Sequence, residues 1–195
     1  FTADVSDFNA VQQLAKKIKS EIGIPDILIN NAGKGIWKFI EETKYEEVSE
    51  MMAVPYFASF YMTKAFLPDM QKRNSGHIVN MTSYAGFIAF SGATAYIAAR
   101  TAMIGFHNAL AADLQGTKIK TSLAYFANVT SYYWQNNPGS EERLATSQVL
   151  ISVISSEKAA CAIVKGVQKG KRKIAAPFMI FVMNLVIHYM PGVAR

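Results

Sequence analysis

Ser83 and Tyr96 are the two residues whose types and spacing best suit catalysis in this chain. Ser83 closes an apolar run at residues 77–82 that is typical of a buried strand, and Tyr96 follows thirteen positions later in a helical pattern. A serine at a strand end can orient a carbonyl oxygen while a tyrosine on the next helix exchanges a proton with it. The pair therefore indicates acid/base chemistry on a carbonyl or hydroxyl group.

The elements that must position this pair alternate along the chain. Short apolar runs at residues 27–29, 77–82 and 119–126 predict strands, and longer helical patterns separate them. Strands that alternate with helices at these lengths favour right-handed crossovers and a mainly parallel sheet of the α/β class. Ligands bind such sheets beyond the carboxyl ends of the strands, and both Gly33 and Ser83 fall there.

Three local features add to this outline. The run at residues 27–29 is continuous, so we expect a strand covered on both faces. Pro55 stands inside the helical pattern of residues 44–74 and must kink or break it. The irregular segment 127–150 follows a predicted strand end and suits a substrate cover. Its aromatic residues 132–134 either line a pocket or only cover the core.

Composition limits the class of protein. A chain of 195 residues with 51% hydrophobic and 17% charged residues predicts one globular domain rather than a disordered chain. The single cysteine, Cys161, cannot form an internal disulfide, and its apolar helical setting predicts a buried thiol. His77 and His107 have no companions at metal-ligand spacing, so we predict no metal site.

The net charge of +6 is concentrated near the C-terminus. Five basic residues precede an apolar tail at residues 174–195: Lys165, Lys169, Lys171, Arg172 and Lys173. No motif interleaves these charges with base-stacking aromatics, so we predict no nucleic-acid partner.

The apolar stretch within this tail is too short to span a bilayer. It can be a helix that packs on the core or a subunit partner, or a helix that lies on a membrane surface. No signal peptide is visible, so we expect a cytoplasmic protein, with peripheral membrane contact through the tail as a hypothesis.

Together with Asn30-Asn31-Ala32-Gly33, the Ser83 and Tyr96 pair resembles the short-chain dehydrogenase/reductase family over about residues 1–170. The resemblance implies a Rossmann-like, doubly wound parallel sheet over residues 1–173, and an NAD(P)-dependent oxidoreductase. By the same resemblance, Tyr96 is the general acid/base and Ser83 orients the substrate oxygen. The substrate would be a hydrophobic carbonyl or secondary alcohol, and the cofactor NAD or NADP.

The resemblance also implies the cofactor contacts. The residues that match cofactor-binding positions are Asp4, Val5, Asn31, Ala32, Gly33, Tyr96, Arg100 and Val129. Family members often pair through helices that correspond to residues 44–74 and 92–114, so a homodimer or tetramer is expected by resemblance.

Four departures from the family pattern keep a second interpretation open. Arg100 stands where the family has the third catalytic residue, a lysine, and Pro55 where it commonly has an asparagine. Residues 126–127 replace the usual Pro-Gly beside the nicotinamide. The glycine-rich turn should precede Phe1, so the chain is expected to lack the first βα units. The alternative is a catalytically degenerate relative that acts as a binding or scaffolding module.

Overall fold

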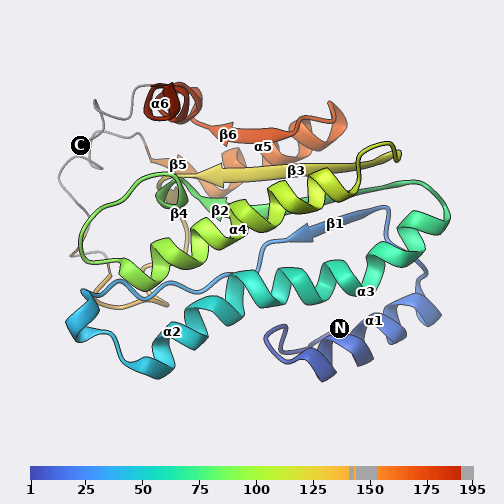
Figure 1. Cartoon of the computed structure of the whole chain (residues 1–195), viewed down its shortest axis with the longest axis horizontal. Coiled ribbons are helices and arrows are strands. Elements are labelled where there is room, and N and C mark those ends of the chain that lie inside the picture. The colour runs from blue at the N-terminus through green and yellow to red at the C-terminus, as the bar shows by residue number, and fades with distance from the viewer. Residues whose placement is uncertain (141–142, 144–152, 190–195) are drawn as a thin grey trace.

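A four-stranded parallel sheet forms the centre of the protein. The computed structural model describes residues 1–140, 143 and 153–189 (Figure 1). The strands lie in the order β1 (Ile27–Asn30), β2 (Gly76–Ser83), β3 (Ile119–Phe126) and β6 (Lys173–Ala176). The Rossmann-like α/β fold predicted from the sequence is confirmed, and the three predicted strands are found within one residue of their expected ends.

Helices cover both faces of this sheet because successive side chains on a buried parallel strand point to opposite faces. Ile78 packs in a cluster with α1 (Phe8–Glu21), α3 (Ala58–Lys72) and α4 (Thr94–Asp113). Val79 faces the opposite side, where α5 (Ser156–Gln168) packs. In Figure 1, α3 and α4 lie in front of the sheet and α5 lies behind β3.

The carboxyl ends of the strands all meet at one edge, on the left in Figure 1. Short elements surround that edge: the 3-10 turns η1 (Ile40–Glu42) and η3 (Tyr84–Gly86), and a small parallel pair, β4 (Val129–Thr130) and β5 (Ile154–Ser155). The helix α2 (Tyr45–Met52) leads into the kinked segment η2 (Ala53–Phe57) and then into α3. The predicted kink at Pro55 is confirmed, since Val54 leaves helical geometry at φ −131° and ψ 97°.

The expectation that the first strand is covered on both faces is wrong. Leu28 and Asn30 are buried, but Ile27 and Ile29 are each 48% exposed. Among the described residues, β1 is the edge strand and no helix packs over the face that carries these two isoleucines. A continuous apolar run cannot distinguish these two situations, because it reports the side-chain types and not the neighbours.

The C-terminal region also differs from the expectation. Residues 174–176 continue the sheet as part of β6, because the free edge of β3 offers backbone hydrogen-bonding partners. The tail helix, α6 (Phe178–Tyr189), starts only after Pro177, and its Ile180 packs on Leu123 and Tyr125 on the same face as α4. The thiol of Cys161 is exposed rather than buried, since α5 packs on the sheet through other positions such as Ala159.

Candidate active site

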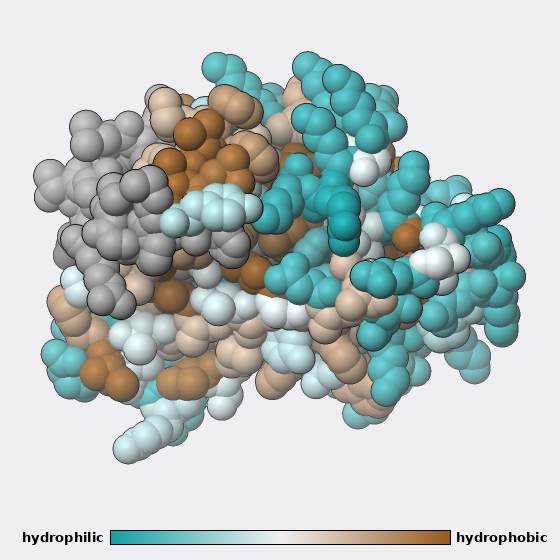
Figure 2. Space-filling view, turned by 45° about the horizontal axis from the view of Figure 1, so that its top comes forward, coloured by the Kyte–Doolittle hydropathy of each residue, from teal (hydrophilic) through white to brown (hydrophobic). Residues whose placement is uncertain are grey.

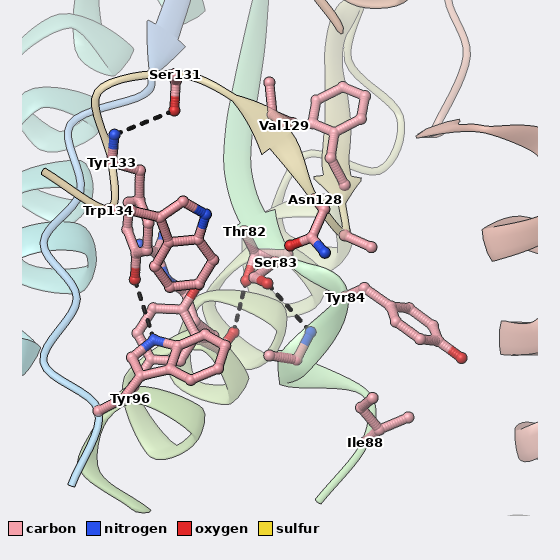
Figure 3. A pocket seen from close by; sticks show the side chains of 15 residues that line it. Thr82, Ser83, Tyr84, Ile88, Tyr96, Asn128, Val129, Ser131, Tyr133 and Trp134 are labelled. Atoms are coloured by element: carbon pink, nitrogen blue, oxygen red, sulfur yellow. Dashed lines mark hydrogen bonds between the residues drawn. The ribbon is translucent and has the colours of Figure 1, made fainter. Parts of the chain in front are cut away.

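A pocket opens at the carboxyl edge of the sheet, between the ends of β2 and β3 and the start of α4. Its lining residues come from four separate segments of the chain (Figure 3). They include Thr82, Ser83, Tyr84, Ile88, Tyr96, Arg100, Asn128, Val129, Ser131, Tyr133 and Trp134. The structure therefore places Ser83, Tyr96, Arg100 and Val129, four of the residues expected at the site, around one cavity.

Ser83 is held at the end of β2 as the first residue of a turn. Its hydroxyl oxygen accepts a hydrogen bond from the backbone N–H of Ala85 at 3.2 Å, which caps η3. A hydroxyl that accepts one bond keeps its own proton for donation. Ser83 can therefore donate to an oxygen atom bound in the pocket.

The neighbouring Thr82 fixes the strand end relative to the helix. Its hydroxyl donates to the backbone carbonyl of Arg100 at 2.9 Å, and this bond is buried. It ties the end of β2 to the helical turn that carries Tyr96, one turn before Arg100. The spacing of the serine and the tyrosine across two elements is thus held by a specific polar contact.

Tyr96 and Arg100 are buried side by side on α4, with 5% and 7% of their surface exposed. The guanidinium carbon of Arg100 lies 4.9 Å from the centre of the Tyr96 ring, a cation–π contact. Arg100 Nη2 donates to the backbone carbonyl of Lys34 at 3.3 Å. Its Nε is buried without a hydrogen-bond partner among the described residues. Arg100 therefore keeps a fixed positive charge against the tyrosine ring, although a guanidinium cannot pass on a proton in a protein.

Gly33 allows this position of Arg100. A Cβ atom at residue 33 would lie 2.9 Å from Arg100 Nη2, so only glycine lets the guanidinium approach the backbone this closely. Asn31, Ala32 and Gly33 are exposed just beyond the end of β1. This open backbone beside a cation is compatible with a cofactor ribose or nicotinamide at this edge of the sheet.

Aromatic side chains close the pocket opposite Ser83. The indole N–H of Trp37 donates to the hydroxyl of Tyr133 at 3.1 Å, and Trp37 also packs against Tyr96 with ring centres 5.3 Å apart. Trp134 meets Trp37 edge to face at 5.3 Å. Burial raises the pKa of Tyr133, and the neighbouring Tyr96 raises it further. Tyr133 therefore stays protonated and neutral beside the candidate acid/base.

Two hydrogen bonds attach this cover to the segment after β1, and a third lies within the cover. The backbone N–H of Gly35 donates to Asn137 Oδ1 at 2.9 Å, and that of Trp37 donates to the hydroxyl of Ser140 at 3.2 Å. Asn137 also donates to the carbonyl of Tyr133 at 2.6 Å. A Cβ at residue 35 would lie 1.6 Å from the Tyr133 hydroxyl oxygen, so the glycine is required for this closure.

Buried amides support the strand ends behind the pocket. Asn30 Nδ2 donates to Thr63 Oγ1 at 3.0 Å and to Asn80 Oδ1 at 2.8 Å. These bonds join β1, β2 and α3. Asn30 is therefore a structural residue, whereas its neighbours in the Asn30-Asn31-Ala32-Gly33 run face solvent.

The remaining sequence candidates lie away from this pocket. The Asp4 carboxylate accepts from the backbone N–H and the hydroxyl of Ser6, at 2.9 and 2.6 Å, and the hydroxyl bond is the first cause that lowers its pKa. Val5 is exposed. Pro55 is buried in the kink, where the carbonyl of Val54 is free to accept from the Lys34 backbone N–H at 3.3 Å. Proline thus supplies a bend at this position and no side-chain amide.

Sequence reasoning missed Trp37 and Asn137 and left Tyr133 and Trp134 undecided. Trp37 lies outside every predicted element, and Asn137 lies in an irregular segment. A compositional signal was present, because the chain has only two tryptophans and both contact this pocket. The fold and the paired hydroxyls define an α/β protein with a ligand site at the carboxyl edge of a parallel sheet.

The chain belongs to the short-chain dehydrogenase/reductase family, because the family profile described as short chain dehydrogenase matches residues 1–140. Estradiol 17-beta-dehydrogenase 11 of Macaca fascicularis is 31% identical over 194 residues, which cover 98% of this chain and 62% of that protein. The 17-beta-hydroxysteroid dehydrogenase 13 of Rattus norvegicus is 30% identical over the same shares. The chain thus spans less than two thirds of the length of these two relatives.

Solved structures agree with this assignment. A short-chain dehydrogenase from Streptomyces avermitilis superposes with a TM-score of 0.83 and 27% identity, over 100% of this chain and 75% of that one. A family member from Burkholderia phymatum, solved in complex with NAD, superposes with a TM-score of 0.84 over 99% of this chain and 75% of that one. Its 23% identity supports the fold alone.

Proposed function

We propose that the protein is an NAD(P)-dependent oxidoreductase that transfers a hydride between nicotinamide and a carbonyl or secondary alcohol. One observation carries this proposal: Ser83 and Tyr96 line the same pocket, and Arg100 places a fixed cation on the tyrosine ring. The bound cofactor supplies or accepts the hydride. The residues that would hold its nicotinamide side are Asn31, Ala32, Gly33, Arg100 and Val129, while Asp4 and Val5 would meet the adenine side.

The side chains of the pocket would handle the oxygen atom and its proton. In the direction of reduction, Ser83 donates a hydrogen bond to the carbonyl oxygen and Tyr96 gives that oxygen its hydroxyl proton. The negative charge left on the phenol oxygen is stabilised by the Arg100 guanidinium. The proton returns to Tyr96 from water, because Arg100 cannot relay it.

The substrate class we propose is a hydrophobic carbonyl or alcohol, such as a steroid. Supporting this, one part of the pocket wall is aromatic and aliphatic, with Trp37, Ile88 and Trp134, although polar side chains such as Ser83, Asn128 and Ser131 line the rest. The relatives described above are named as estradiol and hydroxysteroid dehydrogenases. Apolar walls with a small number of placed polar groups are typical of sites for such ligands.

Replacement of Tyr96 by Phe tests the catalytic role. We expect the natural full-length protein to lose about 10²- to 10⁴-fold in turnover, the usual contribution of a positioned acid/base. The measurement is NAD(P)H absorbance with a panel of hydroxysteroids. Tyr132→Phe is the matched control, because Tyr132 is 74% exposed and outside the pocket lining. Turnover close to wild type in Tyr96→Phe would show that the acid/base is misassigned.

A second candidate is a degenerate relative that binds ligands or partners without turnover. It is favoured by Arg100, whose Nε is buried with no hydrogen-bond partner among the described residues, and by Pro55, which supplies no amide in the kink. The double replacement Arg100→Lys with Pro55→Asn separates the two candidates. A large gain in activity from a weak or absent starting level supports degeneration. If the wild type is active and the double variant is less active, Arg100 works as a substitute for the lysine of the family.

We also propose a homodimer through a groove between α3 and α4. The groove is lined by aromatic side chains such as Tyr56, Phe60 and Phe106, and Phe60 is 39% exposed. Lys64 and Asp113 line the same groove, and neither forms an ion pair among the described residues. In an isologous interface, a contact of the lysine of one copy with the aspartate of the other is made a second time by symmetry, so two ion pairs would form. Sedimentation velocity over a range of concentrations tests it.

A further inference from the structure

The exposed face of α6 is an apolar stripe. Phe178 is 74% exposed and Met179 is 61% exposed, and the stripe continues through Val182, Leu185 and Val186. These positions recur at the three- and four-residue spacing that places side chains on one helix face. Ile180 points the other way and is fully buried against Leu123 and Tyr125. One side of α6 therefore anchors it to the sheet and the other presents apolar side chains outward.

A cluster of cations lies where α5 turns into β6, the strand that leads into α6. Its members are Lys165, Lys169, Lys171, Arg172 and Lys173, and all five are exposed. None of them forms an ion pair within the described part of the chain. On the face shown in Figure 2, apolar side chains gather toward the end where α6 lies, and hydrophilic ones gather toward the other end. We call the exposed side of α6 and these five residues the α6 surface.

We propose that the α6 surface binds an anionic lipid bilayer, with α6 lying in the plane of the headgroup region. Its apolar stripe would enter the boundary between headgroups and acyl chains, while the cluster contacts anionic headgroups. The helix has 12 residues, and none of the helices in the described part of the chain is both long and apolar enough to cross a bilayer. An orientation along the surface fits this length.

Charge favours a bilayer over a second copy of the chain. A two-fold contact through the α6 surface would bring two sets of five cations together, and like charges placed face to face oppose association. An anionic bilayer instead offers negative charge around an apolar interior, which matches the stripe and its basic neighbours. The proposal is independent of the catalytic role of Tyr96, since it rests on residues that are outside the pocket lining.

Vesicle flotation of the whole chain tests the proposal. We expect at least tenfold stronger binding to phosphatidylcholine vesicles that contain phosphatidylserine than to phosphatidylcholine alone, and a decrease as salt screens the cluster. Phe178→Ser with Met179→Ser should abolish most of the binding, as should Lys171→Glu with Lys173→Glu. Lys16→Glu with Lys17→Glu on α1 makes the same charge change elsewhere and should bind as the wild type does.

A fluorescent label tests the orientation of α6. In a Cys161→Ser background, an environment-sensitive dye at Val182→Cys should shift to the blue on addition of anionic vesicles, and a dye at Gln13→Cys on α1 should not. Tryptophan fluorescence confirms that each variant is folded, because Trp37 and Trp134 are packed at the pocket. Absence of binding by the folded wild type at low salt overturns the proposal and points to an acidic protein partner. If the Lys171/Lys173 and the Lys16/Lys17 charge reversals weaken vesicle binding equally, the proposal is overturned as well.

Discussion

Two groups of aromatic side chains flank α4, and they differ in how polar groups fix them. The pocket cluster consists of Trp37, Tyr96, Tyr133 and Trp134, and the groove cluster of Tyr56, Phe60, Tyr61 and Phe106. A partly buried hydrogen bond between Trp37 and Tyr133 joins two rings of the pocket cluster, and further bonds hold its backbone. In the groove cluster the rings contact one another, and no hydrogen bond to these side chains is found in the described residues. Part of this cluster faces solvent.

The comparison teaches that aromatic content does not reveal the role of a cluster. Rings alone give area that can be buried against a partner, and they tolerate several arrangements. Rings tied by directional hydrogen bonds are held in one arrangement, as a site for chemistry requires. We therefore expect the pocket cluster to be sensitive to single atoms and the groove cluster to respond mainly through association.

The largest effect on stability should come from a residue of α4, the helix that carries Tyr96 of the pocket cluster and Phe106 of the groove cluster. Burial, and then the charges of Arg172 and Lys173, lower the pKa of His107 on α4 to about 4. The folded state therefore keeps this histidine neutral between about pH 6.5 and 4, while the unfolded chain takes up a proton. Stability from this group is complete above its unfolded pKa and falls by about 3 kcal/mol as the pH drops toward 4.

Urea unfolding at pH 7 and near pH 4.5 measures this loss. The acid-induced drop in unfolding free energy should be smaller in His107→Gln than in the wild type. His77→Gln is the comparison variant, because burial also lowers the pKa of His77, although His77 retains a hydrogen bond to Ser122. If the unfolding free energy of both variants and of the wild type changes equally with pH, protonation of His107 is not the cause of the loss of stability in acid.

A methyl group at Gly35 should break the pocket cluster. Gly35→Ala places a carbon 1.6 Å from the Tyr133 hydroxyl oxygen, so the tyrosine must leave and its bond with Trp37 is lost. We expect a loss of about 2 kcal/mol in unfolding free energy and a red shift of tryptophan emission.

The matched change in the groove cluster is Gly105→Ala. Nothing lies within 4 Å of a Cβ at this helical position, so alanine should stabilise the protein by about 0.5 to 1 kcal/mol. The tryptophan spectrum should not change. Similar destabilisation by both substitutions would remove the distinction between the two clusters.

Loss of a single hydroxyl should have a smaller effect. Tyr133→Phe leaves the buried indole N–H of Trp37 without its acceptor, and we expect a cost of about 1 kcal/mol in unfolding free energy. In assays of the proposed activity, KM should change more than kcat, because Tyr133 covers the pocket and transfers no proton. Parallel assays of unfolding and of steady-state kinetics check this, and an equal fall of kcat and kcat/KM would instead assign Tyr133 to the chemistry.

The smallest effect on the monomer should come from Phe60→Gln in the groove cluster. Since Phe60 is 39% exposed, its replacement should change the unfolding free energy of the monomer by no more than about 0.5 kcal/mol. The proposed dimer should nevertheless dissociate at a higher protein concentration than the wild type does, as measured by sedimentation velocity. Unchanged association would place the subunit contact elsewhere.

The sequence by itself determined the local elements and their order. The apolar runs predicted β1, β2 and β3, Pro55 predicted the kink, and the predicted strand ends placed Gly33 and Ser83 at the carboxyl edge of the sheet. These features follow from backbone geometry and side-chain periodicity, which act over a few residues.

Only the tertiary structure decided what surrounds these elements. It brings Tyr133 to Trp37, which is 96 positions away along the chain, and it leaves Ile27 and Ile29 on an open face. It also turns residues 174–176 into a strand, because β3 has a free edge there. Contacts between distant segments depend on how the elements pack, and a pattern of residue types along one segment does not report its neighbours in space.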